Sequence, residues 1–384
     1  MTIEEIQTVC FVGAGTMGCF NAIKAATSGY DVVLYDIDEE NLRQSTQRCQ
    51  GLAEYLAATG YCVSDNIPAA MARISRVPDL ALATREADLV SESVFERLDI
   101  KRDVHRKLDE TCPAKTILTS NSSYLLLSRF EDVVQRGDRI AALHSYMASP
   151  LMDIVGGPRT SSATVDILKR YVESIHAVPL VLKKEYPGYV LNAVLGPVLA
   201  TAMFLLIEGL GDCEAVDRAW MRHRHAPMGP LGILDMIGLG PVHDSWLHRE
   251  DDGPIPGLRP GVLQLLHPLV EKGALGMQAG SGFYQYPEPA YQQPDFLAAG
   301  PDREDLYAAM ELALVGSAVL VAAHNVADPA DIDRAWMVGT SLNTGPFAIL
   351  EQTGAAQFKK RFCEHVERGR FNPDNGRLVM DYLD

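Results

Sequence analysis

The first half of the chain alternates between short apolar runs and longer stretches with an apolar residue at every third or fourth position. The short runs, rich in Val, Ile and Leu, predict β-strands, and the stretches between them predict amphipathic helices. This alternation indicates a parallel sheet covered by helices on both faces. The predicted strands are Thr8–Val12, Asp31–Tyr35, Arg73–Val77, Asp88–Ser91, Thr116–Thr119, Ile140–Leu143 and Val178–Leu182, and the main predicted helices are Thr16–Ser28, Glu39–Ala58, Arg97–Glu110 and Ser162–Ile175.

The hydrophobic pattern changes after a polar segment, Lys183–Gly188, that ends in a Pro-Gly break. Helical periodicity dominates beyond it. We therefore predict an α/β, Rossmann-type doubly wound domain over residues 1–185, followed by an all-α C-terminal region with an internal repeat. That region is expected to form two helical domains, 186–300 and 301–384.

The repeat is visible in the sequence itself. Residues 216–235 read VDRAWMRHRHAPMGPLGILD and residues 332–351 read IDRAWMVGTSLNTGPFAILE, with nine identical positions out of twenty and no gap. An Asp that can cap a helix precedes each copy, at Asp212 and Asp328, and Pro329 stands where a first helical residue is expected. We interpret this as a duplication.

Composition and charge narrow the function classes. The 384 residues carry a formal net charge of −16, which argues against nucleic acid or an anionic membrane as the main partner. Seven scattered cysteines without a CxxC pair are typical of a reduced, cytoplasmic chain without a structural metal. The N-terminus lacks the order of a signal peptide, and Val194–Ile207, taken as the longest apolar stretch, is too short to span a bilayer.

A glycine-rich turn follows the first predicted strand. The segment Gly13-Ala14-Gly15-Thr16-Met17-Gly18 matches GxGxxG and leads into a helix. Gly13 permits the tight turn, Gly15 lets the backbone approach a pyrophosphate, and Gly18 allows close packing of helix on sheet. The second strand is followed by Asp36, whose carboxylate would accept hydrogen bonds from the adenosine ribose and repel a 2′-phosphate. NAD, rather than NADP, is the expected cofactor.

Further chemistry-bearing residues lie in the same half and at its border. They are Glu96, Lys101, Asn121 in the run Ser120–Ser123, His144 and Asn192. Ser123 and His144 each follow the end of a predicted strand, where ligands bind in open parallel sheets.

In its motifs the chain resembles the 3-hydroxyacyl-CoA dehydrogenase family over nearly its whole length. The resemblance rests on GxGxMG at 13–18, Glu96 with Lys101, Ser-Asn-Ser-Ser at 120–123 and His144, followed by PGYVLN at 187–192, PMGP at 227–230 and GFY at 282–284. It implies a small-molecule substrate, either an acyl-CoA or a hydroxyacid. Single-repeat members of the family dimerise through the helical domain, so a second copy could cover that face and give a monomer with an internal pseudo-dimer. A homodimer is the alternative.

The resemblance also implies roles for single residues. His144 would be the general base that takes the hydroxyl proton as hydride leaves for NAD. Ser123 would hydrogen-bond the reacting oxygen and Asn192 would orient the substrate. Glu96, Lys101 and Asn121 would line the cofactor.

The sequence departs from the family pattern next to His144. The family pairs its histidine with a glutamate about a dozen residues later, but Ile154–Pro158 holds no carboxylate, so that partner is expected to be missing. Asp153 is nearby, with a direction that strand alternation does not fix. Met147 also replaces a polar residue, and Arg43 and Arg48 are the only cations between residues 41 and 72 that could meet CoA phosphates. The alternatives are therefore a CoA-independent hydroxyacid dehydrogenase and an NAD-binding protein with little turnover.

Overall fold

A computed structural model describes all residues except 1, 148 and 250–252, and it divides the chain into two compact units. The first unit runs from Met1 to Tyr189 and includes two short later segments, 325–327 and 338–340. The second unit comprises the remaining residues from Val190 onward. The predicted three-domain division, with its boundaries at 185 and 300, stays a prediction.

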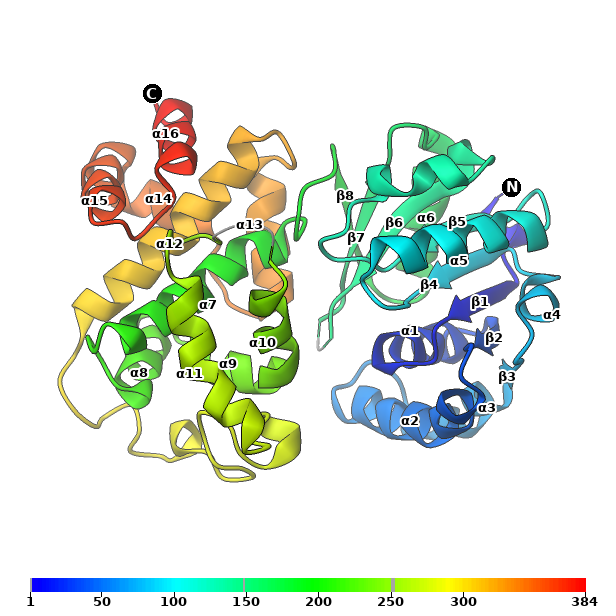
Figure 1. The fold of residues 1–384 in the computed structure, drawn as a ribbon, viewed down its shortest axis with the longest axis horizontal. Helices are drawn as coiled ribbons and strands as arrows, with labels where there is room; N and C mark the ends of the chain where they lie inside the picture. Colours follow the sequence, from blue (N-terminus) through cyan, green and yellow to red (C-terminus); the bar gives the residue numbers. More distant parts are fainter. Residues whose placement is uncertain (1, 148, 250–252) are drawn as a thin grey trace. The chain divides into compact units, whose positions relative to one another are not determined.

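The first unit is built on one eight-stranded sheet with the order β3-β2-β1-β4-β5-β6-β7-β8 (Figure 1). Strands β1 to β6 run parallel, whereas β7 pairs antiparallel with β6, so the expectation of a fully parallel sheet is wrong at this one pair. The order reverses direction at β1, which is where doubly wound folds bind nucleotides. The strands are β1 Thr8–Val12, β2 Asp31–Tyr35, β3 Ile74–Arg76, β4 Leu89–Glu92, β5 Ile117–Ser120, β6 Ile140–Ser145, β7 Leu151–Gly156 and β8 Val178–Leu182.

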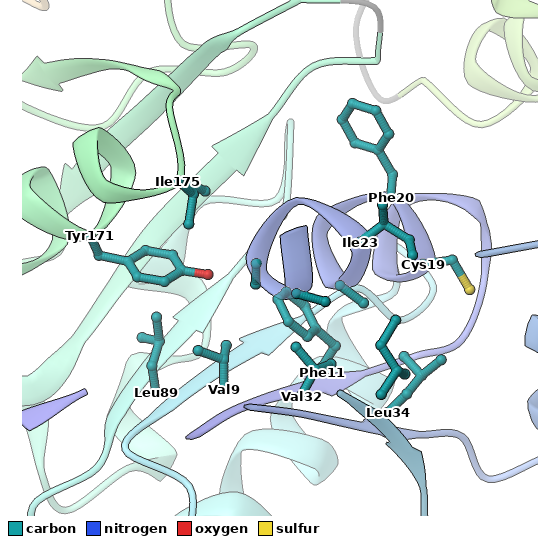
Figure 2. Close-up of a cluster of buried hydrophobic side chains, with 14 of the residues drawn as sticks. Val9, Phe11, Cys19, Phe20, Ile23, Val32, Leu34, Leu89, Tyr171 and Ile175 are labelled. Atoms are coloured by element: carbon teal, nitrogen blue, oxygen red, sulfur yellow. The ribbon is translucent and has the colours of Figure 1, made fainter. Parts of the chain in front are cut away.

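Each face of the sheet buries its own hydrophobic core, because alternate residues of a strand point to opposite faces. In β1, Val9 and Phe11 belong to one cluster, shown in Figure 2, while Cys10 and Val12 belong to the other. This is the two-sided burial that the apolar strands predict. The helices of the unit are α1 Thr16–Thr27, α2 Glu39–Ala58, α3 Ile67–Ala72, α4 Leu80–Thr84, α5 Leu98–Thr111 and α6 Ser162–Ser174.

The second unit is helical, as expected, and its helices repeat. Helix α8 (Cys213–Arg224) and helix α13 (Pro329–Thr340) are offset by 116 residues, from 213 to 329 and from 224 to 340. Each ends on a non-glycine residue in the left-handed region, His225 at φ 51° and Ser341 at φ 60°. The remaining helices are α7 Leu191–Ile207, α9 Pro230–Ile237, α10 Leu239–Leu247, α11 Arg259–Glu271, α12 Glu304–Ala323, α14 Pro346–Thr353, α15 Ala355–Glu367 and α16 Pro373–Tyr382.

The two copies pack against each other inside this unit. Helices α7 and α12, which end 116 residues apart at 207 and 323, lie in contact. Trp220 and Trp336, which occupy equivalent repeat positions, stack edge to face with ring centroids 6.4 Å apart. Equivalent residues that touch each other indicate an internal pseudo-two-fold arrangement.

Helix α12 corrects one expectation from the sequence. A helix other than Val194–Ile207 is the one to consider as a membrane span: α12 covers 20 residues and is long and apolar enough to cross a membrane. However, 78% of its apolar window is buried inside the structure, as in the core helix of a helical unit.

Candidate active site

The glycine-rich turn has the geometry that a bound dinucleotide requires. Gly13 has φ +104°, and a Cβ there would lie 2.5 Å from the Ser93 carbonyl oxygen. A Cβ on Gly18 would lie 1.8 Å from the Gly13 oxygen, so the helix start can pack this closely only with glycine. Gly15, the residue before α1, has nothing within 4 Å of its Cβ position, which leaves room for a pyrophosphate.

The N-terminus of α1 begins directly at this turn, with Thr16 and Met17 in its first turn. Among the described residues no side chain caps it, so its backbone N–H groups and the helix dipole are available to phosphate oxygens.

Asp36 stands at the end of β2, as the sequence predicts. Its Oδ2 accepts hydrogen bonds from the Ala14 N–H at 2.7 Å and from Asn41 Nδ2 at 2.7 Å. The carboxylate is partly exposed beside the glycine-rich turn, so it is both held in place and within reach of ribose hydroxyls. The residues present therefore fit NAD.

His144 lies in a line of three side chains near the end of β6. Its Nε2 is 2.9 Å from Ser123 Oγ, and its Nδ1 is 3.2 Å from Asp153 Oδ2. The Asp153 carboxylate favours the tautomer with the proton on Nδ1, so Nε2 accepts the hydrogen bond that the Ser123 hydroxyl donates. A base with a lone pair on Nε2, beside a hydroxyl donor, can take a proton from an alcohol.

Asp153 corrects the expectation that His144 has no carboxylate partner. Strands β6 and β7 are antiparallel, and their register places His144 directly opposite Asp153. The Cβ atoms of such a pair lie about 4.5–5.5 Å apart, which suits a short aspartate. The sequence contained the residue but not the register, and the register decides where the side chain points.

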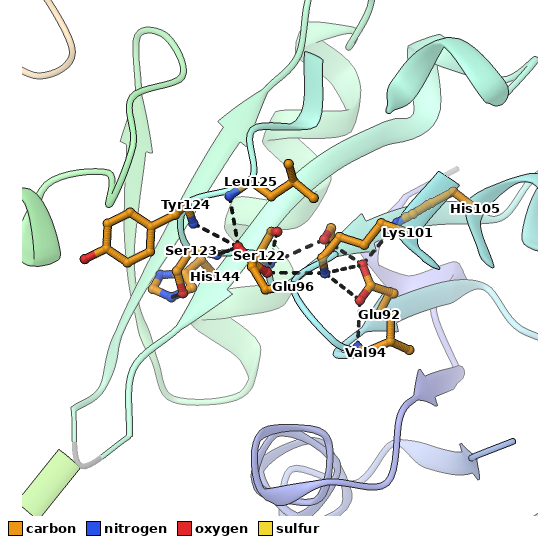
Figure 3. Close-up of polar contacts among 11 residues, drawn as sticks. Glu92, Val94, Glu96, Lys101, His105, Ser122, Ser123, Tyr124, Leu125 and His144 are labelled. Carbon is orange, nitrogen blue, oxygen red and sulfur yellow. Dashed lines mark hydrogen bonds and ion pairs between the residues drawn. The ribbon is translucent and has the colours of Figure 1, made fainter. Parts of the chain in front are cut away.

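Glu96 holds the loop that carries Ser123, as Figure 3 shows. Its Oε1 accepts the backbone N–H groups of three successive residues, Ser123, Tyr124 and Leu125, at 2.9–3.1 Å. Its Oε2 accepts the Ser122 hydroxyl at 2.8 Å. Glu96 therefore positions the loop that carries Ser123. Its contact with the cofactor stays a prediction.

Lys101 is buried and reaches inward to a carboxylate that the sequence analysis missed. Its Nζ lies 2.8 Å from Glu92 Oε1 at the end of β4, and Glu92 also contacts His105 and the Ser120 hydroxyl (Figure 3). Burial would raise the pKa of Glu92, but the Lys101 charge and the hydrogen bond from His105 outweigh it and lower this pKa to about 2. A carboxylate directly after the predicted strand Asp88–Ser91 was the available signal.

The two asparagines differ in what the structure places around them. Asn121 Oδ1 accepts the Ser145 N–H at 2.8 Å, which links the ends of β5 and β6. Asn192 belongs to the second unit, in the first turn of α7, so its role toward the substrate stays a prediction.

Topology explains why these residues meet. Strands β1, β4, β5 and β6 are neighbours and parallel, so their carboxyl ends share one edge of the sheet. The glycine-rich turn follows β1, Ser123 follows β5, and His144 is near the end of β6. A dinucleotide site and a base–hydroxyl pair on one edge define a nicotinamide-dependent dehydrogenase.

Comparisons with known proteins name the family. Residues 8–186 match the NAD-binding domain of 3-hydroxyacyl-CoA dehydrogenase, and residues 188–286 match its C-terminal domain. A probable 3-hydroxybutyryl-CoA dehydrogenase of Bacillus subtilis (strain 168) is 31% identical over 74% of this chain and 99% of its own length. The mitochondrial hydroxyacyl-coenzyme A dehydrogenase of Sus scrofa is 30% identical over 73% and 91%. The chain belongs to the 3-hydroxyacyl-CoA dehydrogenase family and is an NAD-dependent enzyme.

Two solved structures add to this assignment. A diketoreductase described as acting on dicarbonyl compounds is 34% identical, covers 73% of this chain and 99% of its own, and has a TM-score of 0.67. A 3-hydroxybutyryl-CoA dehydrogenase of Escherichia coli K12, at 21% identity, shows the fold alone, with a TM-score of 0.76 over 98% of this chain and 99% of its own. The second likeness extends over the duplicated helical region.

Proposed function

We propose that the enzyme interconverts a 3-hydroxyacyl and a 3-oxoacyl thioester of CoA, with His144 as general acid and base. The observation that carries the proposal is the hydrogen-bonded line Ser123–His144–Asp153 on the sheet edge that also holds the glycine-rich turn. The names of the two relatives supply the thioester class.

In the oxidative direction, NAD held at the glycine-rich turn would supply the acceptor for the hydride that leaves the substrate carbon. His144 Nε2 takes the hydroxyl proton at the same time, while Asp153 stabilises the imidazolium that forms. When substrate binds, Ser123 would turn its single hydroxyl proton from His144 Nε2 to the reacting oxygen, which frees the Nε2 lone pair and offsets the charge that develops on that oxygen. The family resemblance implies a role for Asn192 in orienting the substrate, and this role stays a prediction.

A second candidate is a CoA-independent dehydrogenase acting on a free 3-hydroxy or 3-oxo compound. The two arginines of α2 favour this candidate. Arg43 forms an ion pair with Glu40, and Arg48 donates a hydrogen bond to the Ala14 carbonyl. Both have partners within the chain, which leaves less charge for CoA phosphates. The diketoreductase supports the same possibility through its dicarbonyl substrates.

The third reading, an NAD-binding protein with little turnover, rested on the absence of a carboxylate partner for His144. Asp153 removes that argument, because the imidazole has a buried carboxylate on Nδ1.

One assay separates the candidates. NADH consumption is followed with acetoacetyl-CoA and with free acetoacetate, for the wild type and for His144→Ala. Turnover of the thioester that the variant loses supports the main proposal, and turnover of the free acid alone supports the second candidate. NADH binding without turnover of either compound contradicts both.

We further propose that the protein works as a monomer in the cytoplasm, in which α7 and α12 supply to each other the surface that a partner chain would otherwise cover. The internal contact of repeat-equivalent residues supports the monomer. The scattered cysteines and the acidic charge are the basis for the location.

A further inference from the structure

Asp153 has an unusual set of partners for a buried carboxylate. It is 0% exposed, and two donors converge on a single oxygen: His144 Nδ1 at 3.2 Å and the Tyr146 hydroxyl at 2.5 Å from Oδ2. The other oxygen, Oδ1, is buried and has no hydrogen-bond partner among the residues that the structure describes. The position of the Asp153 carboxylate therefore depends on these two donors among the described residues.

The strand geometry explains how Tyr146 reaches this carboxylate. Tyr146 directly follows β6, whose last ladder pair joins Ser145 to Met152, the neighbour of Asp153. Its hydroxyl reaches the same Asp153 oxygen as His144 Nδ1. The Tyr146 ring also packs edge to face on the His144 imidazole, with centroids 4.4 Å apart.

Burying a carboxylate is costly unless donors stabilise its charged form. A hydrogen bond from a hydroxyl favours the charged form over the neutral acid. Only the charged form both keeps the proton on His144 Nδ1 and stabilises the imidazolium during catalysis. Burial, with the Asp153 charge, raises the pKa of Tyr146 well above its usual value, so its phenol remains a donor at every working pH.

Resting on the proposed function, we infer that Tyr146 is a positioning residue of the reaction: its hydroxyl binds Asp153 Oδ2 and holds that carboxylate against His144 Nδ1, which orients the imidazole. Asp153 and Tyr146 together then orient the catalytic histidine, the task of the glutamate that follows this histidine in the family pattern. Aspartate has a shorter side chain than glutamate. It can still reach His144 because Asp153 lies directly opposite His144 on the neighbouring strand.

The test uses Tyr146→Phe, which keeps the buried ring and removes only the hydroxyl. We expect kcat to fall by about 10- to 100-fold, the worth of a hydrogen bond to a charged group, with NADH affinity unchanged. Asp153→Asn should lower kcat further, by up to about 10⁴-fold, as when a triad carboxylate is neutralised. Tyr30→Phe is the matched control, since it removes a hydroxyl bonded to Ser174 Oγ at 2.6 Å, and should leave kcat unchanged.

A second readout does not depend on turnover. In ¹⁵N NMR of the full chain, His144 of the wild type should be protonated on Nδ1, and Tyr146→Phe should shift this toward a mixture of tautomers. An unchanged kcat in Tyr146→Phe overturns the inference, because the Tyr146 hydroxyl then does not contribute to catalysis. A lowered kcat with an unchanged tautomer also overturns it, because Tyr146 then acts by another route. If the wild type turns over neither acetoacetyl-CoA nor acetoacetate, the proposed function fails, and the tautomer still tests Tyr146.

Discussion

At the scale of single residues, Ser123 belongs to the loop that Glu96 holds, and its hydroxyl contacts the imidazole of His144. Ser123→Ala removes the donor to the reacting oxygen, and we expect kcat to fall about 10²- to 10³-fold, as when one oxyanion donor is lost. Steady-state kinetics with the active substrate measure the change. The control, Ser128→Ala, alters an exposed serine nearby. An equal loss in both variants would contradict a direct contact between Ser123 and substrate.

At the same scale, we predict that Asp36 sets the preference for NAD over NADP. Asp36→Ala should raise the affinity for NADP relative to NAD, because the carboxylate that repels a 2′-phosphate is gone. Asp38→Ala is the matched control: Asp38 caps α2 by accepting the Glu40 N–H at 2.9 Å and is exposed. Fluorescence titrations with NADH and NADPH give the ratio. If Asp36→Ala and Asp38→Ala change that ratio equally, the ribose contact is not at Asp36.

At the scale of elements, the two copies of the repeat share one helix-capping contact. Asp217 on α8 accepts the backbone N–H groups of Leu231 and Gly232 in the first turn of α9, both at 2.9 Å. Asp333 on α13 does the same for Phe347 and Ala348 in α14, at 2.7 and 3.0 Å. Each aspartate therefore joins two consecutive helices of its copy at a fixed angle.

This shared contact predicts a stability effect. Asp333→Ala should lower the free energy of unfolding of the second unit by about 0.5–2 kcal/mol, the worth of a helix cap. Asp331→Ala, in the same helix, removes only a half-exposed ion pair with Arg334 and should cost much less. Urea unfolding followed by tryptophan fluorescence measures both, since the three tryptophans lie in the second unit. Equal effects would show that Asp333 does not act as a cap.

At the scale of the whole molecule, the internal packing of α7 on α12 predicts a monomer. Light scattering after size exclusion should give a mass close to 42.0 kDa over a wide range of protein concentration. The physical reason is that each copy buries the apolar face of the other, which leaves that face unavailable to a second chain. A dimer that persists on dilution would contradict this prediction.

The sequence by itself determined most of the elements, the NAD-binding turn and the family, but it did not predict strand β7. These depend on local signals: the strand-and-helix alternation, the glycines at 13, 15 and 18, and Asp36 at a fixed distance along the chain. It also predicted His144 and Ser123 as site residues, because each follows a predicted strand in the sequence, and the structure brings the two into contact.

Only the tertiary structure decided what surrounds His144. Its partner depends on the register of an antiparallel pair, and a shift of one residue would turn Asp153 to the other face of the sheet. The contacts of Glu92 likewise depend on packing, because α5 brings Lys101 and His105 to its carboxylate. Contacts between residues distant along the chain are fixed by packing, which no local pattern contains.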